Sequence, residues 1–311
     1  MKKDQAKAFA PATVANVAVG FDLLGFPIEG VGDFVTVKRI SKPEVIIKKV
    51  SGVQEELPLN PEDNTAGMSL IKMIEKMDLD FGFEVSIEKG IPISSGMGGS
   101  AASAVGAVVA ANELLETPLL KDQLLTFALE GEAVASGSKH ADNVAPCLHG
   151  GLTLCLSMDP IQIIEIPVPK DIYCVLVYPK VKMDTKEARS VLKKEIPLSL
   201  SVKQSAMLSG FLSGCYTGNL DLIRSSMNDL IIEPQRSSFI PGFDQAKKDA
   251  LVQGALGFSI SGAGSSVFAW ACSQENAKNI ENAIVKQLEK ENEVKSWVSP
   301  INLDGAHVLP D

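Results

Sequence analysis

Residues 92–103 read Pro92-Ile93-Ser94-Ser95-Gly96-Met97-Gly98-Gly99-Ser100-Ala101-Ala102-Ser103, a glycine-rich stretch between a strand pattern and a helix pattern. The preceding run, 81–89, alternates apolar and polar residues, and the following run, 101–115, is rich in small apolar residues. Closely spaced glycines let backbone N–H groups converge without Cβ interference, and a helix N-terminus adds partial positive charge. The stretch therefore predicts a cradle for nucleotide phosphates. A plain turn before a tightly packed Ala/Gly helix stays open as the alternative.

This loop differs from two common nucleotide-binding motifs. No Lys-Ser or Lys-Thr pair follows its glycines, which excludes a Walker A loop, and their spacing does not fit the dinucleotide fingerprint. Its combination of glycines, hydroxyls and a helix start is typical of phosphate binding. We therefore interpret the chain as a phosphoryl-transfer enzyme.

Composition limits the class of protein. The chain has 311 residues, of which 45% are hydrophobic, so it can bury a large core. Its net charge of −9 argues against a nucleic-acid-binding surface but not against anionic ligands, which local loops and arginines can hold. No apolar run is long enough to cross a membrane, and the N-terminus lacks the apolar segment of a secretion signal.

The five cysteines, at 147, 155, 174, 215 and 272, form no C-x-x-C pair and lie among apolar or small residues. They are typical of reduced core residues in a cytosolic protein, and we expect a cytoplasmic location. The three histidines have no metal-ligand spacing.

Strand and helix patterns alternate irregularly, which favours an α+β fold over a doubly wound sheet. We expect strands at 14–19, 34–40, 81–89, 150–156, 172–178, 258–260 and 266–271, and helices at 64–77, 101–115, 119–132, 201–215, 219–230, 242–254 and 275–291. The proline-rich segment 160–170 suggests a junction between an N-terminal ATP-binding domain, 1–165, and a C-terminal domain, 166–311, that completes the substrate site.

Three motifs in this order resemble the small-molecule kinases that include galactokinase, homoserine kinase, mevalonate kinase and phosphomevalonate kinase. The first is Pro11-Ala12-Thr13-Val14-Ala15-Asn16 with Gly20-Phe21-Asp22-Leu23-Leu24-Gly25. The second is the loop at 92–102, and the third is Ser261-Gly262-Ala263-Gly264-Ser265-Ser266-Val267-Phe268-Ala269. The resemblance covers nearly the whole chain. It implies a two-domain fold, with ATP and Mg²⁺ bound in an active site between the domains.

Within this family, the first motif and His140-Ala141-Asp142-Asn143-Val144-Ala145-Pro146 most resemble the homoserine kinases. That likeness implies ATP-dependent phosphorylation of the hydroxyl of L-homoserine to O-phospho-L-homoserine, a step toward threonine, and a homodimer. A kinase of mevalonate, shikimate or another alcohol, and a non-catalytic ligand-binding relative, are the alternatives. The loop departs from the family's usual Gly-Leu-Gly-Ser-Ser, because Gly99 removes one hydroxyl while Ser100 keeps the other.

The resemblance assigns Ser100 and Glu132 to Mg²⁺, which prefers a few hard oxygen ligands from the protein. From the residues alone, a helix-cap serine and a solvated glutamate are equally ordinary. Asn64 and residues 92–102 are assigned to ATP, although Asn64 also fits a helix cap. The late loop, 261–266, is expected to approach substrate or phosphates closely.

The acceptor is assigned to Asn16, Asp22, His140, Arg189 and Arg236. Asp22 would receive an ammonium group, and the planar arginines would bind a carboxylate. Without the resemblance, Asp22 is typical of a turn, the arginines of surface ion pairs and His140 of a structural residue.

Asn143 occupies the place where mevalonate kinase has a candidate catalytic aspartate, seven residues before Gly150. An amide cannot act as a general base, and we expect the neighbouring Asp142 to face another side of the chain. The implied mechanism is therefore direct attack of the acceptor hydroxyl on the γ-phosphate, with rate gained from positioning and charge neutralisation. Thr185 is a further candidate for orienting that hydroxyl.

Overall fold

Alternating apolar residues build a seven-stranded sheet in the first half of the chain. The computed structural model describes residues 3–53, 55–181, 183 and 185–310. In the first sheet, β1 (Gln5–Ala15), β2 (Leu24–Ile40) and β4 (Gly82–Glu88) pair antiparallel, and β3 (Val45–Ser51) runs parallel to β4. The start of β2 also pairs with β5 (Leu152–Met158), which pairs with β6 (Ile161–Ile166). The short β11 (His307–Val308) returns from the C-terminal end to the free edge of β1.

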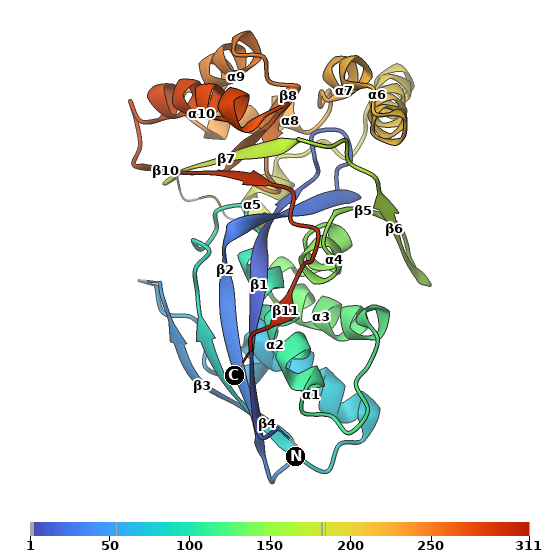
Figure 1. Cartoon of the computed structure of the whole chain (residues 1–311), viewed down its shortest axis with the longest axis vertical. Helices are drawn as coiled ribbons and strands as arrows, with labels where there is room; N and C mark the ends of the chain where they lie inside the picture. Colours follow the sequence, from blue (N-terminus) through green and yellow to red (C-terminus); the bar gives the residue numbers. More distant parts are fainter. Residues whose placement is uncertain (1–2, 54, 182, 184, 311) are drawn as a thin grey trace.

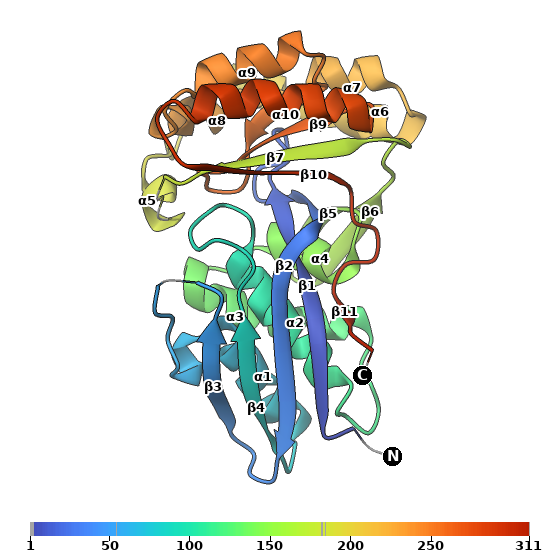
Figure 2. The ribbon, with the colours of Figure 1, turned by 60° about the vertical axis from the view of Figure 1, so that its left-hand side comes forward.

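Four helices cover one face of this sheet, as Figure 2 shows. They are α1 (Thr65–Met77), which follows the 3-10 turn η1 (Pro61–Asp63), α2 (Gly99–Asn112), α3 (Lys121–Ser136) and α4 (Ala141–His149). Every residue of α2 from Ala101 to Ala111 is buried. Its small side chains permit close packing, since a Cβ on Gly106 would lie 2.7 Å from Cγ2 of Val35 in β2.

The second half forms a four-stranded antiparallel sheet. Its order is β10 (Val294–Pro300), β7 (Tyr173–Pro179), β9 (Val267–Ala271) and β8 (Gly257–Ile260). The helices α9 (Phe243–Val252) and α10 (Gln274–Leu288) cover its outer face, and α6 (Leu198–Thr217) and α7 (Leu220–Ser226) lie beside them (Figure 1). The short α5 (Thr185–Ser190), α8 (Glu233–Arg236) and η2 (Ser237–Phe239) complete this half. The predicted α+β class is confirmed.

A cluster of aromatic rings joins the two halves. The ring of Phe26 on β2 lies edge-on to Trp270 and Phe268 of β9, at centroid distances of 5.7 and 6.1 Å. On the other side, Trp270 contacts Phe211 of α6 at 5.3 Å. All four side chains belong to one continuous buried core that includes residues of both sheets. The boundary at residue 165 stays a prediction.

The predicted elements depart from the structure at several places. Neither β10 nor the short β11 was predicted, and the helix expected at 219–230 ends at Ser226. The strand expected at 14–19 ends at Ala15, because Asn16, Val17 and Ala18 have positive φ angles of 70°, 46° and 59° that break an extended strand. The proline-rich junction contains β6, whose isoleucines pair with β5. The segment after His140 forms α4, which was not predicted.

Pro146 lies inside α4 and cannot donate to the carbonyl of Asp142, four residues earlier. That carbonyl instead abuts β2, where a Cβ on Gly25 would lie 1.8 Å from it. Glycine at position 25 therefore allows α4 to approach the sheet closely.

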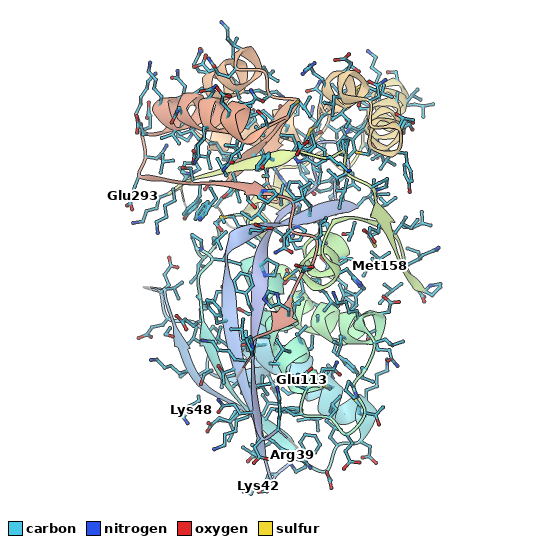
Figure 3. The ribbon with its side chains drawn as sticks, viewed as in Figure 1. Arg39, Lys42, Lys48, Glu113, Met158 and Glu293 are labelled. Atoms are coloured by element: carbon cyan, nitrogen blue, oxygen red, sulfur yellow. The ribbon has the colours of Figure 1, made fainter. Side chains whose placement is uncertain are left out.

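Charged side chains cluster away from this packing. In Figure 3, Arg39 and Lys42 lie at the tip of the first sheet, and Glu293 lies at the edge of the second. Arg39 stacks over the ring of Phe81 with its guanidinium carbon 3.6 Å from the ring centroid. Among the described residues, no helix is long and apolar enough to span a membrane. The cytoplasmic location and the homodimer stay predictions.

Candidate active site

The glycine-rich loop lies between β4 and α2, and its glycines adopt conformations that side chains rarely reach. Gly96 and Gly98 have φ angles of 77° and 68°. A Cβ on Gly96 would lie 2.4 Å from the carbonyl oxygen of Ser261, and one on Gly98 would lie 2.1 Å from Oγ1 of Thr13. Both positions therefore require glycine for space as well as for backbone conformation.

The three sequence motifs meet around this loop. The hydroxyl of Ser261 donates to the carbonyl of Gly96 at 2.7 Å, and Ser266 N–H donates to the carbonyl of Ser95 at 3.0 Å. The first motif joins them, since Asn16 Nδ2 donates to the carbonyl of Gly262 at 2.9 Å. The late loop thus packs directly on the glycine-rich loop, and its expected approach to substrate or phosphates stays a prediction.

A cavity of about 400 Å³ opens beside the loop at the start of α2. The following predicted ATP and metal residues line it: Asn64, Pro92, Ile93, Ser94, Ser95, Gly96, Gly98, Gly99, Ser100 and Glu132. Three others, Met97, Ala101 and Ala102, are fully buried in the core behind it. We call this space the nucleotide cavity.

Asn64 caps α1, as one of its two interpretations predicted. Its Oδ1 accepts from the N–H groups of Ala66 and Gly67 at 3.0 and 3.3 Å, and its Nδ2 donates to the carbonyl of Pro58 at 2.9 Å. The side chain therefore orders one wall of the nucleotide cavity.

A smaller cavity of about 70 Å³ adjoins the first. All five predicted acceptor residues line it: Asn16, Asp22, His140, Arg189 and Arg236. The two cavities share Glu132, Asn143, Gly262 and Ala263, so these residues form the wall between them. We call the smaller space the acceptor cavity. The side chain of Thr185 lies outside the described part of the structure.

Charged groups of the acceptor cavity pair with one another. Asp22, at a positive φ of 59°, accepts two hydrogen bonds from the guanidinium of Arg189, at 2.8 and 3.0 Å. This pairing raises the pKa of Arg189. Nδ1 of His140 lies 3.7 Å from Asp22, and burial lowers the pKa of this imidazole.

Arg236 is held by main-chain oxygens. Its Nε donates to the carbonyl of Ala188 at 2.9 Å, and its Nη1 donates to the carbonyl of Gly262 at 3.2 Å. Burial lowers its pKa to about 10, with a further contribution from the like charge of Arg189. It therefore stays charged at neutral pH and presents a fixed cation to the cavity.

Ser100 of the nucleotide cavity contacts Glu132 of the shared wall. The hydroxyl of Ser100, in the first turn of α2, donates to Oε1 of Glu132 on α3 at 3.0 Å. Burial raises the pKa of Glu132 to about 7, against the effect of this hydrogen bond. A buried carboxylate and a hydroxyl fit Mg²⁺, which takes hard oxygen donors and completes its shell with phosphates and water.

Asp142 was placed wrongly by sequence reasoning. It lines the acceptor cavity together with Asn143, because both lie in the first turn of α4. Burial raises the pKa of Asp142 to about 7, and the nearby charge of Asp22 adds to this rise. No local sequence signal indicated which way the side chain of Asp142 points, since α4 itself was not predicted.

A buried ionic cluster supports the glycine-rich loop from below, and sequence reasoning missed it. Lys89 pairs with Asp33 and donates to the hydroxyl of Ser103 at 2.9 Å. Asp33 also accepts from the N–H groups of Gly90 and Ile91 at 3.0 and 3.2 Å. One sequence feature could have indicated this cluster, because Lys89 ends a predicted strand and directly precedes the loop.

The chain matches known proteins along its length. Residues 65–151 match the GHMP kinases N terminal domain, and residues 207–290 match the GHMP kinases C terminal domain. A homoserine kinase of Xylella fastidiosa is 48% identical over 98% of this chain and 94% of its own length. Another, of Chloroherpeton thalassium, is 41% identical over 98% of this chain and 99% of its own length.

Solved structures show the same architecture. A crystal structure of homoserine kinase from Cytophaga hutchinsonii, 44% identical, superposes with a TM-score of 0.96 over 99% of this chain and 98% of that one. A mevalonate kinase from L. major in complex with R-mevalonate, 16% identical, has a TM-score of 0.73 over 97% of this chain and 99% of that one. The second likeness shows the fold alone.

Proposed function

This chain belongs to the GHMP kinase family, and we propose that it transfers the γ-phosphoryl group of ATP to the side-chain hydroxyl of L-homoserine. GHMP kinases use ATP as phosphate donor, generally with Mg²⁺. The observation that carries the proposed acceptor is the charge pattern of the acceptor cavity.

Three carboxyl groups, those of Asp22, Glu132 and Asp142, and two guanidiniums line the small cavity, a mixed charge pattern that matches a zwitterionic amino acid. Arg189 and Arg236 provide planar donors for an α-carboxylate, and Asp22 and Asp142 provide acceptors for an α-ammonium. An acceptor such as mevalonate or shikimate carries a carboxylate and hydroxyls but no ammonium, and would bring no positive charge to Asp22 and Asp142. An amino acid brings both charges, so the cavity favours the amino acid.

The nucleotide cavity holds the phosphates through its main chain. Loop N–H groups and the start of α2 supply donors and partial positive charge to the phosphate oxygens. Ser100 and Glu132 would hold Mg²⁺, which would neutralise charge on the transferring phosphates. Glu132 belongs to the shared wall and Ser100 is hydrogen-bonded to it, so a metal held by the two would bring the phosphates to the side that faces the acceptor.

We infer that the phosphoryl transfer depends on how the acceptor hydroxyl and the γ-phosphate are positioned. The acceptor hydroxyl, held at the shared wall, attacks the γ-phosphorus in line while the bond to ADP breaks, and late in this step its proton passes to a non-bridging oxygen of the transferred phosphoryl group, from which it exchanges with solvent. Asn143 faces this wall and, as an amide, orients groups by hydrogen bonding without accepting the proton. The fixed amides and cations around the wall supply the charge neutralisation.

The test is a coupled ADP-release assay with Mg-ATP and a panel of L-homoserine, mevalonate, shikimate and galactose. We expect strong preference for L-homoserine. D-homoserine and L-homoserine methyl ester, in which the carboxylate is repositioned or esterified while the hydroxyl stays free, serve as matched controls for the charge pattern. Preference for an acceptor without an ammonium group would overturn the proposed substrate but not the kinase reaction. ATP binding without turnover of any acceptor would support a non-catalytic relative.

A further inference from the structure

Thr13 has no role in the reaction described so far, yet it makes a side-chain contact with a residue of the shared wall. It lies near the end of β1, and its side chain has no exposed surface. Its hydroxyl donates to Oδ1 of Asn143 on α4 at 2.7 Å. Its N–H also donates to the carbonyl of Met97 in the glycine-rich loop at 3.1 Å. A single residue therefore joins the phosphate loop to Asn143.

The hydrogen bond from Thr13 fixes the orientation of the Asn143 carboxamide, that is, which of its two polar groups faces the cavities. The oxygen and the NH₂ group of a carboxamide diverge from the same carbon, so fixing the oxygen also fixes the NH₂ group. With Oδ1 held by the buried Thr13, the NH₂ group is the end left for the two cavities that Asn143 lines. Without this hydrogen bond the carboxamide could rotate and present either its oxygen or its NH₂ group to the two cavities.

Gly98 supports the same arrangement from the loop side. A Cβ at position 98 would lie 2.1 Å from Oγ1 of Thr13 and 2.8 Å from Oδ1 of Asn143. The glycine therefore leaves room for the hydrogen bond to form directly beneath the loop. Three segments distant in sequence, which carry Thr13, Gly98 and Asn143, converge on this one contact.

We infer that Thr13 is a positioning residue, which holds the Asn143 amide so that its NH₂ group donates a hydrogen bond across the shared wall. The natural recipients there are an oxygen of the transferring phosphoryl group or the oxygen of the attacking hydroxyl, both of which carry lone pairs. Such a donor stabilises negative charge on the phosphoryl oxygens. This inference rests on the proposed function for its kinetic test but not for its spectroscopic one.

The kinetic test compares Thr13→Val, Thr13→Ser and wild type. Valine keeps the shape of threonine but removes the hydroxyl, so we expect kcat to fall about tenfold while KM for both substrates changes little, as the loss of one positioning hydrogen bond predicts. Thr13→Ser keeps the hydroxyl and should retain most of kcat. Thr153→Val, a buried threonine of the same sheet outside both cavities, is the control for lost stability and should leave kcat unchanged.

A double-mutant cycle then asks whether Thr13 acts through Asn143. If it does, Thr13→Val should cost little further kcat in an Asn143→Ala background. The inference is overturned by wild-type kcat in Thr13→Val, by equal loss in Thr13→Ser, or by the same fold loss in both backgrounds.

A second readout needs no turnover. The side-chain NH₂ resonance of Asn143, assigned by its disappearance in Asn143→Ala, should shift or broaden in Thr13→Val and stay near its wild-type position in Thr13→Ser. An unchanged resonance in Thr13→Val would overturn the inference even if the wild-type chain phosphorylated no acceptor. If the wild-type chain phosphorylated no acceptor of the panel, but the Asn143 resonance shifted in Thr13→Val, only the proposed function would be overturned.

Discussion

The nucleotide cavity is lined mainly by uncharged residues, with several glycines of the two loops among them, whereas about half of the residues that line the acceptor cavity have charged or titratable side chains. In the first, Gly96 and Gly98 fit where any Cβ would overlap a neighbour. In the second, Asp22, Arg189 and Arg236 present full charges. The backbone surface suits a phosphate chain whose oxygens are alike along its length. The charged surface suits a small substrate, because the enzyme can discriminate it from similar molecules by the position of each of its charges.

The comparison extends to what holds each wall in place. The glycine-rich loop is fixed by hydrogen bonds to Ser261 and Ser266 and by the buried Lys89–Asp33 pair. The acceptor residues Asp22 and Arg189 hold each other, and a zwitterion can insert between them by giving each a new partner. The nucleotide side is therefore preorganised by the fold, and the acceptor side is preorganised by its own charges.

Glu132 belongs to both cavities, and replacing it should have the largest effect. Glu132→Gln keeps the size of the side chain and an acceptor for Ser100 but removes the negative charge offered to Mg²⁺. We expect kcat to fall about 10³-fold with Mg-ATP, as is typical when a metal-binding carboxylate is lost. Glu130→Gln on the same helix, a half-exposed residue paired with Lys139, is the control. Activity of Glu132→Gln near that of the control would remove Glu132 from the metal site.

The same carboxyl should make the stability of the ligand-free protein depend on pH. The pKa of Glu132 is raised to about 7 in the fold, so the folded chain keeps a proton that the unfolded chain has already lost above about pH 5. Stability should therefore fall as pH rises from about 5 to about 8, by about 3 kcal/mol for this group. Thermal or urea unfolding of wild type and Glu132→Gln across this range measures the difference. Parallel curves for the two proteins would contradict the burial of a titrating carboxyl.

The backbone character of the nucleotide cavity is tested by adjacent glycines. Gly98→Ala forces a side chain into a positive φ and into contact with Thr13 and Asn143, so we expect a loss of about 3 kcal/mol in stability and slower turnover. Gly99→Ala places its Cβ 3.3 Å from Ile91 at the first position of α2, and should be nearly neutral. Urea unfolding and ATP titration of the pair measure the contrast. Equal effects at the two positions would show that the close contacts of Gly98 do not matter.

The side-chain character of the acceptor cavity is tested at Asp22. Asp22→Asn should raise KM for L-homoserine about 10- to 100-fold, because a charge-assisted contact to the ammonium becomes a neutral one. KM for ATP should change little, since Asp22 does not line the nucleotide cavity. Asp221→Asn, an exposed aspartate that pairs with Arg224, is the control. Steady-state kinetics with each substrate varied gives both values, and an unchanged KM for L-homoserine would exclude the ammonium role.

Local patterns predicted the motifs and most of the elements. The glycine-rich loop, the alternating strand before it and the small-residue helix after it were all found from neighbouring residues, because each depends on short-range periodicity. Many residues of both cavity walls, among them Glu132, Arg189 and Arg236, had been assigned from the resemblance to known kinases, whereas Asp142 had not. The serine, aspartate, glutamate and glycine residues that lie together in the structure had been named individually from the sequence, without a prediction that they are in contact.

What the sequence did not predict are contacts between distant segments. The pairing of Asp22 with Arg189 joins residues 167 positions apart, and that of Thr13 with Asn143 joins residues 130 positions apart. The direction of Asp142 depended on α4, whose internal Pro146 disguised the helix pattern. Pairings of this kind arise only when tertiary packing brings the segments together, so no local rule contains them.

The aromatic cluster between the sheets has an optical consequence. The indole of Trp270 has no exposed surface and lies between Phe26 of the first sheet and Phe211 on the other side. Any separation of the two halves would admit water to this ring and shift its fluorescence emission to longer wavelength. The chain thus carries a built-in reporter at the junction above its active site, readable without a label once the signal of the half-buried Trp297 is removed by substitution.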